Sequence, residues 1–132
     1  MILIDSNVLM YAAGAPHSHK DPSRAFLEGV ARGEIDAAVD AEVLQEVLHR
    51  YQAIGRWEDG RKVYDLARRI VPIVVPITAE IVDLARSLLD RYRSLMARDV
   101  LHAAAAIVHE AEAIASYDRD FDGIREVRRI EP

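Results

Sequence analysis

The first half of the chain alternates short apolar runs with amphipathic stretches. Ile2–Ile4 is a continuous apolar run, which is typical of a central strand buried on both faces of a parallel sheet. Asp5 follows directly and suits a helix start, so Val8–Ala13 is predicted as a short helix that Gly14 ends. The same reasoning predicts a loop over His17–Pro22, a helix over Ser23–Ala31, a strand over Ala37–Val39 and a helix over Ala41–Ala53 that begins at the cap Asp40.

The second half of the chain continues this alternation. Trp57–Ile70 is predicted as a basic helix after Gly55, and Pro72–Val75 as the strand that follows it. The remaining predicted elements are a helix from the cap Thr78 to about Arg93, a helix over Arg98–Glu112 that is alanine-rich along Ala103–Ala106, a strand over Ala113–Ser116, a loop over Tyr117–Gly123 and a strand over Val127–Ile130. Strands that alternate with helices predict one α/β domain over residues 1–132, a three-layer sandwich with a central, mostly parallel sheet.

The composition narrows the class of protein. The 132 residues include no cysteine, which excludes disulfides, thiolate metal sites and cysteine nucleophiles. No apolar run approaches the roughly 20 residues of a membrane span. Met1–Asp5 lacks the basic region that opens a signal peptide. We therefore expect a cytoplasmic protein that does not bind a membrane.

The net charge of −5 at first argues against a nucleic-acid partner. The 17 basic residues are nearly all arginine, however, because only Lys20 and Lys62 are lysines. Arginine is the better multidentate ligand for phosphate. Setting aside four acids for a metal site would leave a net charge of −1. The acidic balance therefore does not exclude RNA.

Acidic residues stand where a parallel sheet binds its ligands, beyond the carboxyl ends of the strands. Asp5 follows the first predicted strand, and Asp118 follows the strand over Ala113–Ser116. Asp99 opens a predicted helix, and Glu46 flanks the apolar stripe of its own helix. Each acid also has a purely structural interpretation: Asp5 and Asp99 as helix caps, Asp118 as a turn residue and Glu46 as a solvated carboxylate.

Carboxylates that share a cleft need a counter-charge, because repulsion and burial would otherwise protonate some of them. With no cysteine in the chain and no lysine near these positions, the ions that fit are hard divalent cations such as Mg²⁺ or Mn²⁺. In phosphodiester hydrolysis such a cation generates hydroxide from bound water and offsets the charge on the phosphoryl oxygens.

Four segments resemble the four motifs of PIN-domain proteins, and their order and the chain length are similar to those of the VapC toxins of toxin–antitoxin systems. The segments are Asp5–Leu9, Glu42–Val47, Arg98–Ala103 and Ser116–Phe121. The resemblance covers the chain from Ile2 to about Ile130. It implies a five-stranded parallel sheet with helices on both faces.

The same resemblance implies a metal-dependent endoribonuclease that cleaves single-stranded regions of RNA and leaves 5′-phosphate and 3′-hydroxyl ends. By position, the four acids that match the metal-holding residues are Asp5, Glu46, Asp99 and Asp118, and the supporting residues are Asn7 and Ser116. Asp120 and Asp122 are further acids to which the pattern gives no role. Asp40-Ala41 departs from the pattern, which has Ser or Thr at the start of that helix.

The arginines fall into two groups, from Arg50 to Arg69 and from Arg86 to Arg98. They are predicted either to follow an RNA backbone or to lie on solvated helix faces balanced by neighbouring acids, and both interpretations stay open. We expect Arg98, beside Asp99, to lie closest to a bound phosphate. The histidine pairs are interpreted as follows: His17 and His19 as surface residues, and His102 and His109 as packing or surface residues.

The resemblance also implies two protein partners. One is a VapB-like antitoxin that blocks the cleft, and the other is a second copy of the chain in a homodimer. Two alternative functions stay open: an RNA-processing nuclease outside a toxin system, and a non-catalytic PIN-like scaffold. The presence of all four acids favours an enzyme. A phospho-receiver domain is disfavoured, because it needs a lysine after a late strand.

Overall fold

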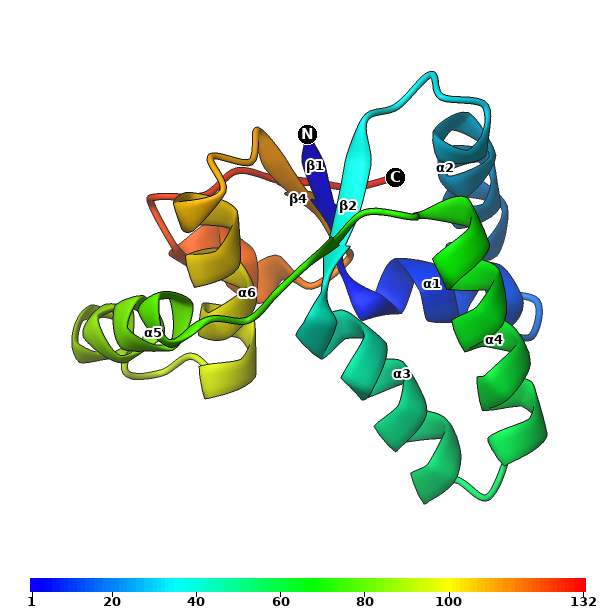
Figure 1. Ribbon diagram of the computed structural model, residues 1–132, viewed down its shortest axis with the longest axis horizontal. Coiled ribbons are helices and arrows are strands. Elements are labelled where there is room, and N and C mark those ends of the chain that lie inside the picture. Colours follow the sequence, from blue (N-terminus) through cyan, green and yellow to red (C-terminus); the bar gives the residue numbers. More distant parts are fainter.

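The computed structural model describes residues 1–132 and has a five-stranded sheet at its centre (Figure 1). The strands are β1 (Ile2–Ile4), β2 (Ala37–Asp40), β3 (Val74–Val75), β4 (Ala113–Ala115) and β5 (Arg129–Ile130). Their order is β3-β2-β1-β4-β5, and every pairing is parallel. The predicted α/β fold with a parallel sheet is therefore confirmed. All five strands end at the same edge, where ligands bind in folds of this class.

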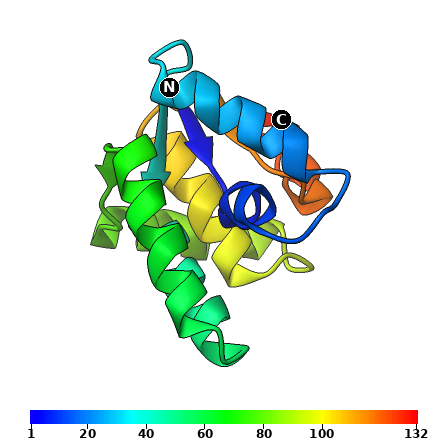
Figure 2. The ribbon, with the colours of Figure 1, turned by 90° about the vertical axis from the view of Figure 1, so that its right-hand side faces the viewer.

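Helices cover both faces of the sheet (Figures 1 and 2). They are α1 (Ser6–Ala13), α2 (Lys20–Ala31), α3 (Ala41–Ala53), α4 (Trp57–Ile70), α5 (Ala79–Arg91), α6 (Ala97–Val108) and the short 3₁₀ helix η1 (Arg119–Gly123). Successive strand residues point to opposite faces, so β1 and β2 each contribute residues to two cores. Leu3 and Ile114 pack with residues of α5 and α6, whereas Ile4 and Val39 pack with residues of α1 to α4.

Helix α6 contains a run of four alanines, Ala103–Ala106, and all four are buried. They belong to the same core as Leu3 of β1 and Ile114 of β4. Because alanine has no side-chain atom beyond Cβ, this run lets the helix lie close to the sheet and to α5. The close packing carries the first turn of α6 to the carboxyl edge of the strands.

Several predicted boundaries were wrong by a few residues. Helix α2 begins at Lys20, so the last part of the predicted loop His17–Pro22 is helical. Pro22 lies in the first turn, where its missing N–H removes no intrahelical hydrogen bond. Helix α1 begins at Ser6 rather than Val8, α6 begins at Ala97 rather than Arg98, β2 extends to Asp40 and β4 ends at Ala115. The other differences are a strand β3 without Pro72 and Ile73, ends of α5 at Arg91 and of α6 at Val108, a turn of 3₁₀ helix within the predicted loop Tyr117–Gly123, and a last strand of only Arg129–Ile130.

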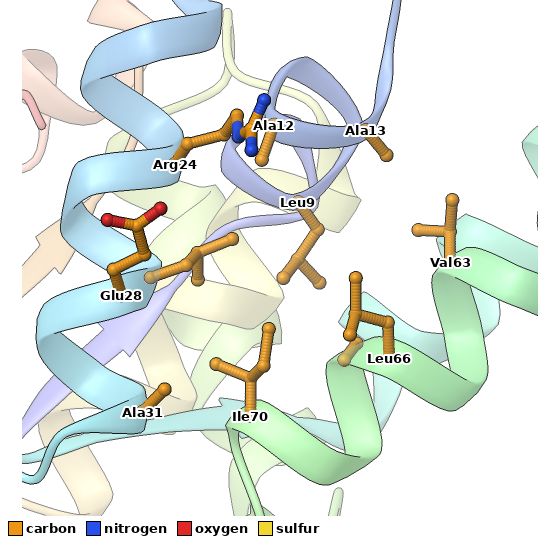
Figure 3. Close-up of a pocket in the computed structure, with 11 residues that line it drawn as sticks. Leu9, Ala12, Ala13, Arg24, Glu28, Ala31, Val63, Leu66 and Ile70 are labelled. Atoms are coloured by element: carbon orange, nitrogen blue, oxygen red, sulfur yellow. The ribbon is translucent and has the colours of Figure 1, made fainter.

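An apolar pocket of about 220 Å³ opens between α1, α2 and α4 (Figure 3). Leu9 and Ala12 of α1 face Leu66 and Ile70 of α4 across it, and Arg24 lies at its α2 side. Leu66 is 45% exposed although its side chain is apolar. None of the helices has the length and the apolar character needed to cross a membrane.

Candidate active site

The carboxyl edge of the sheet is lined by aspartates that also begin helices. Asp5 follows β1, and its Oδ1 accepts a hydrogen bond of 2.7 Å from the backbone N–H of Ser6 at the start of α1. Asp40 ends β2, and its Oδ1 accepts from the backbone N–H of Val43 in α3. Asp118 lies beyond β4 and accepts from the backbone N–H of Asp120. The local need for helix caps therefore fixes three carboxylates at one edge.

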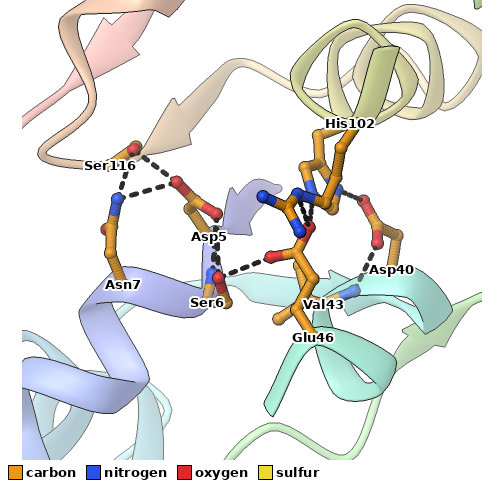
Figure 4. Close-up of polar contacts among 9 residues, drawn as sticks. Asp5, Ser6, Asn7, Asp40, Val43, Glu46, His102 and Ser116 are labelled. Carbon is orange, nitrogen blue, oxygen red and sulfur yellow. Dashed lines mark hydrogen bonds and ion pairs between the residues drawn. The ribbon is translucent and has the colours of Figure 1, made fainter. Parts of the chain in front are cut away.

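Asp5, Glu46 and His102 form what we call the inner cluster. One ligand atom from each lies within 4.8 Å of the others, and all three side chains are buried. They come from the end of β1, the second turn of α3 and the second turn of α6 (Figure 4). Three segments that are distant in sequence thus contribute one side chain each to a single site.

His102 lies between two buried carboxylates. Its Nδ1 donates to Asp40 Oδ2 and its Nε2 donates to Glu46 Oε1, each at 2.7 Å (Figure 4). Burial opposes a charge on this imidazole, but the hydrogen bonds to Asp40 and Glu46 outweigh it and raise the pKa of His102 well above its usual value. His102 is therefore an imidazolium that neutralises part of the carboxylate charge.

Glu46 has two further partners. The hydroxyl of Ser6 donates to its Oε2 at 2.6 Å, and the Nε of Arg98 lies 3.4 Å from its Oε1. The side chain of Arg98 remains about half exposed, so its guanidinium has N–H groups that face solvent. Glu46 is held at a fixed position by donors on α1 and α6.

Asp5 is oriented by a small network of neutral side chains. Ser116 Oγ and Asn7 Nδ2 both donate to its Oδ2, and Asn7 Nδ2 also donates to Ser116 Oγ at 3.0 Å (Figure 4). Ser116 Oγ in turn accepts from the backbone N–H of Asp118 at 2.9 Å. Burial raises the pKa of Asp5, and the hydrogen bond from Ser116 partly offsets that rise. The network connects the end of β1 to the end of β4.

Asp99, Asp118 and Asp120 form the outer cluster, whose nearest carboxylate oxygens also lie within 4.8 Å of one another. None of these three carboxylates forms an ion pair with a basic side chain. Burial, followed by repulsion from Asp118 and Asp5, raises the pKa of Asp99 to about 6. The outer cluster is therefore a concentration of negative charge that the protein itself leaves uncompensated.

This donor set fits a hard divalent cation. The oxygens come from carboxylates, and neither a thiolate nor a lysine lies among them. A bound cation would offset the repulsion between these carboxylates. Asp5 contributes to the raised pKa of Asp99, so the inner and outer clusters share one electrostatic environment. Carboxylates of both clusters are thus available to a metal at this edge.

The structure brings together the acids named from the sequence. Asp5 and Glu46 lie in the inner cluster, and Asp99 and Asp118 lie in the outer cluster. Asn7 and Ser116 contact Asp5, and Arg98 lies beside Glu46. Asp120, which had no predicted role, joins the outer cluster, whereas Asp122 pairs with Arg129 at the surface.

His102, Asp40 and Ser6 were missed as site residues. His102 was interpreted as a packing or surface residue. It is buried, so the surface alternative is wrong, and the interpretation missed its contacts with Asp40 and Glu46. A signal was present in the sequence, because His102 follows Asp99 by three residues and therefore shares its helix face. At Asp40 the chain departs from the family pattern, which has Ser or Thr at this helix start. Two contacts of Asp40 explain the difference, because this aspartate caps α3 and also accepts a hydrogen bond from His102.

Ion pairs with neighbouring acids account for part of the arginines, and the RNA interpretation stays a prediction. Four of them form surface ion pairs with neighbouring acids: Arg56 with Asp59, Arg61 with Glu58, Arg86 with Asp90 and Arg91 with Glu126. Arg50 on α3 is exposed and has no carboxylate partner. Lys62, Arg68, Arg69 and Arg93 are likewise exposed without an ion pair, so balanced helix faces account for only some of the basic residues.

Comparison with known proteins gives consistent matches. The PIN domain family matches residues 2–127. Ribonuclease VapC13 of Mycobacterium tuberculosis is 42% identical over 130 residues, which are 98% of this chain and 99% of the relative. A VapC ribonuclease of Mycobacterium bovis matches with the same identity and coverage.

Solved structures share the fold over nearly the whole chain. VapBC2 of Rickettsia felis, solved with a DNA fragment from its promoter, has a TM-score of 0.77 at 20% identity and covers 99% of this chain and 98% of its own. VapC20 of Mycobacterium tuberculosis, described as a toxin that cleaves the sarcin–ricin loop, has a TM-score of 0.78 at 15% identity, with full coverage of both chains.

Proposed function

Since this chain belongs to the PIN domain family, we propose that it is a metal-dependent endoribonuclease that cleaves single-stranded RNA as the toxin of a toxin–antitoxin pair. One observation carries the proposal: Asp5, Glu46, Asp99 and Asp118 meet at the carboxyl edge of the sheet. Relatives that match almost the full length are named ribonucleases, which supports the activity. We propose the cytoplasm as the place where it acts.

We assign the cation site to Asp5, Glu46, Asp99 and Asp118, with Mg²⁺ or Mn²⁺ as the ion. When bound, such a cation activates water and offsets negative charge on the phosphoryl group. Asp99 and Asp118 provide carboxylates that no basic side chain neutralises. A cation would bind Asp99 in its ionised form. Without the cation, burial and repulsion raise the pKa of this carboxyl to about 6.

The remaining residues of the site orient these acids. Ser116 and Asn7 both donate to one oxygen of Asp5, so its Oδ2 points in a fixed direction. His102 fixes the buried carboxylate of Glu46 by donating to its Oε1 at 2.7 Å. The half-exposed guanidinium of Arg98 is placed to contact a phosphate oxygen of the substrate beside Glu46. Fixed orientation of these groups removes reorganisation from the chemical step.

We further propose that a VapB-like antitoxin restrains the enzyme. The similar fold of VapBC2, a toxin–antitoxin assembly, supports such a partner. The pocket between α1, α2 and α4, with its exposed Leu66, is the apolar surface that we assign to this contact. A homodimer of the chain is part of the same proposal.

The test is RNA cleavage by the purified, antitoxin-free protein. Total cellular RNA is incubated with Mg²⁺, with Mn²⁺ or with EDTA, beside the Asp5→Asn variant, and the fragment ends are sequenced. We expect discrete fragments with 5′-phosphate ends that require the cation and Asp5. Absence of cleavage by folded protein in both cations would refute the nuclease and favour the scaffold function.

A further inference from the structure

A second pocket lies between α1, the C-terminal part of α3 and the start of α4, next to the acids. Its volume is about 360 Å³, within the range of sites that hold small organic groups. The residues that line it are Asn7, Met10, Tyr11, Gly14, Arg50, Tyr51, Ile54 and Arg56. Its lining combines apolar and aromatic side chains with two arginines.

The pocket is continuous with the active site along two helices. Asn7 belongs to both, because it lines the pocket and also donates to Asp5. Tyr11 follows Asn7 by four residues on α1, and Arg50 follows Glu46 by four residues on α3. Four residues of helix advance about 6 Å, and residues so spaced share one face. Tyr11 and Arg50 therefore lie one helical turn beyond residues of the acid site.

Arg50 supplies positive charge that is free to bind a ligand. Its side chain is exposed and pairs with no carboxylate, whereas Arg56 at the same pocket is paired with Asp59 at 2.9 Å. A site that joins a free guanidinium to an apolar wall fits a ligand with an anionic group beside a flat apolar one. A nucleotide within an RNA strand has this chemistry.

The ring of Tyr11 is held rigidly as one wall of the pocket. It packs edge-on against Tyr117, with the ring centroids 5.3 Å apart, and edge-on against His19 at 5.0 Å. Tyr117 in turn stacks on His19 at 3.9 Å and lies between Ser116 and Asp118 in the chain. A ring that is already fixed loses little conformational freedom when a base contacts it.

We propose that this pocket binds the RNA nucleotide next to the scissile bond, with Arg50 on its phosphate and Tyr11, Met10 and Ile54 against its base. This subsite rests on the proposed ribonuclease function, which supplies the scissile bond.

The test compares Arg50→Gln with Arg128→Gln. Arg128 is also exposed and also forms no ion pair, but it precedes β5 and so lies at the opposite edge of the parallel sheet. Both substitutions remove one positive charge. Binding is measured in Mg²⁺ by fluorescence anisotropy of a random-sequence pool of labelled single-stranded RNA, about 12 nucleotides long. All proteins carry Asp5→Asn, so that the RNA stays intact.

We expect Arg50→Gln to raise the Kd about tenfold and to lower the salt dependence of log K by about 0.7, the value for one lost phosphate contact on a single strand. Arg128→Gln is expected to change the Kd less than about twofold. Tyr11→Leu should weaken binding, whereas Tyr11→Phe, which keeps the ring, should not. With Asp5 restored, Arg50→Gln should raise the KM for cleavage more than it lowers kcat.

Equal Kd values for Arg50→Gln and Arg128→Gln would overturn the subsite, and so would absence of RNA binding by the parent protein. Failure of the nuclease function is distinguishable from both. In that case no RNA is cleaved in Mg²⁺ or Mn²⁺, while binding that depends on Arg50 persists and supports the pocket.

Discussion

The inner and outer clusters lie at the same edge of the sheet, but the protein neutralises only one of them. Glu46 in the inner cluster receives hydrogen bonds from Ser6 and from the cationic His102, and Arg98 lies beside it. The outer cluster of Asp99, Asp118 and Asp120 has no such cation. The pKa of Asp99 rises to about 6 as a result of burial and of repulsion from its neighbours.

This contrast separates two tasks that carboxylates perform in one site. The inner carboxylates are held in place by donors on three elements, so removal of a donor should act mainly on stability. The outer carboxylates repel one another. Removal of one of them should therefore lower the rate of RNA cleavage and raise the stability of the folded protein. The largest expected effect is therefore on the rate of RNA cleavage, and the smaller expected effects are on the free energy of unfolding.

Asp99→Asn should lower the single-turnover rate of RNA cleavage by about a thousandfold, because a metal-binding carboxylate is lost. In EDTA the same variant should be more stable than the wild type by about 1 kcal/mol, a figure reduced for the half-exposed position of Asp99. Cleavage assays and thermal unfolding in EDTA measure the two effects. Asp122→Asn is the matched control, since Asp122 pairs with Arg129 at the surface and should leave the rate unchanged. A rate for Asp99→Asn within tenfold of the wild type would contradict the assignment.

His102→Leu should lower the free energy of unfolding by about 3 kcal/mol, because it leaves two buried carboxylates, Asp40 and Glu46, without their cation. Urea unfolding measures this change. His109→Leu on the same helix alters an exposed histidine and should change stability by less than about 0.5 kcal/mol. The loss should shrink when Asp40→Asn is already present, because one of the two stranded charges is then absent. Equal losses in both backgrounds would show that the His102–Asp40 contact is unimportant.

The third test uses pH and concerns Asp99 in the absence of a cation. Its pKa is about 6 in the folded protein against a usual 3.8, so between these values the folded state holds a proton that the unfolded chain has released. The free energy of unfolding should therefore fall as pH rises from about 4 to 6, by up to about 1 kcal/mol after solvent screening. The difference between wild type and Asp99→Asn in EDTA isolates this contribution. With saturating Mg²⁺ the trend should reverse, because the cation binds the ionised carboxylate.

The sequence predicted the helices best where their ends carry strong local signals. The bounds of α3 and α4 were predicted to the residue, because Asp40 caps α3 and Gly55 separates the two helices. The short strands were harder to bound, since their ends are set by pairing with neighbours rather than by their own residues. Lys20–Pro22 was predicted as loop but forms the first turn of α2, where Pro22 is tolerated because its missing N–H has no intrahelical partner.

The acids of the site were predictable, but the partner of Glu46 was not. Asp5 and Asp118 follow strands, and a parallel sheet brings such positions together whatever the details of packing. The contact of His102 with Asp40 and Glu46 depends on how closely α6 approaches the start of α3, a tertiary contact that the helix face shared by Asp99 and His102 does not by itself specify. The spacing of three residues between Asp99 and His102 does indicate that the two side chains share one helix face.

The four buried alanines of α6 have a consequence for the genetics of the proposed toxin. A larger side chain at Ala103 or Ala104 would force α6 away from the sheet and would move Asp99 and His102 with it. Cells that survive expression of the toxin should therefore carry substitutions to valine or threonine along this helix as well as changes of the acids. Escape from toxicity is expected to map also to the buried alanines of α6, which position the acid site without lining it.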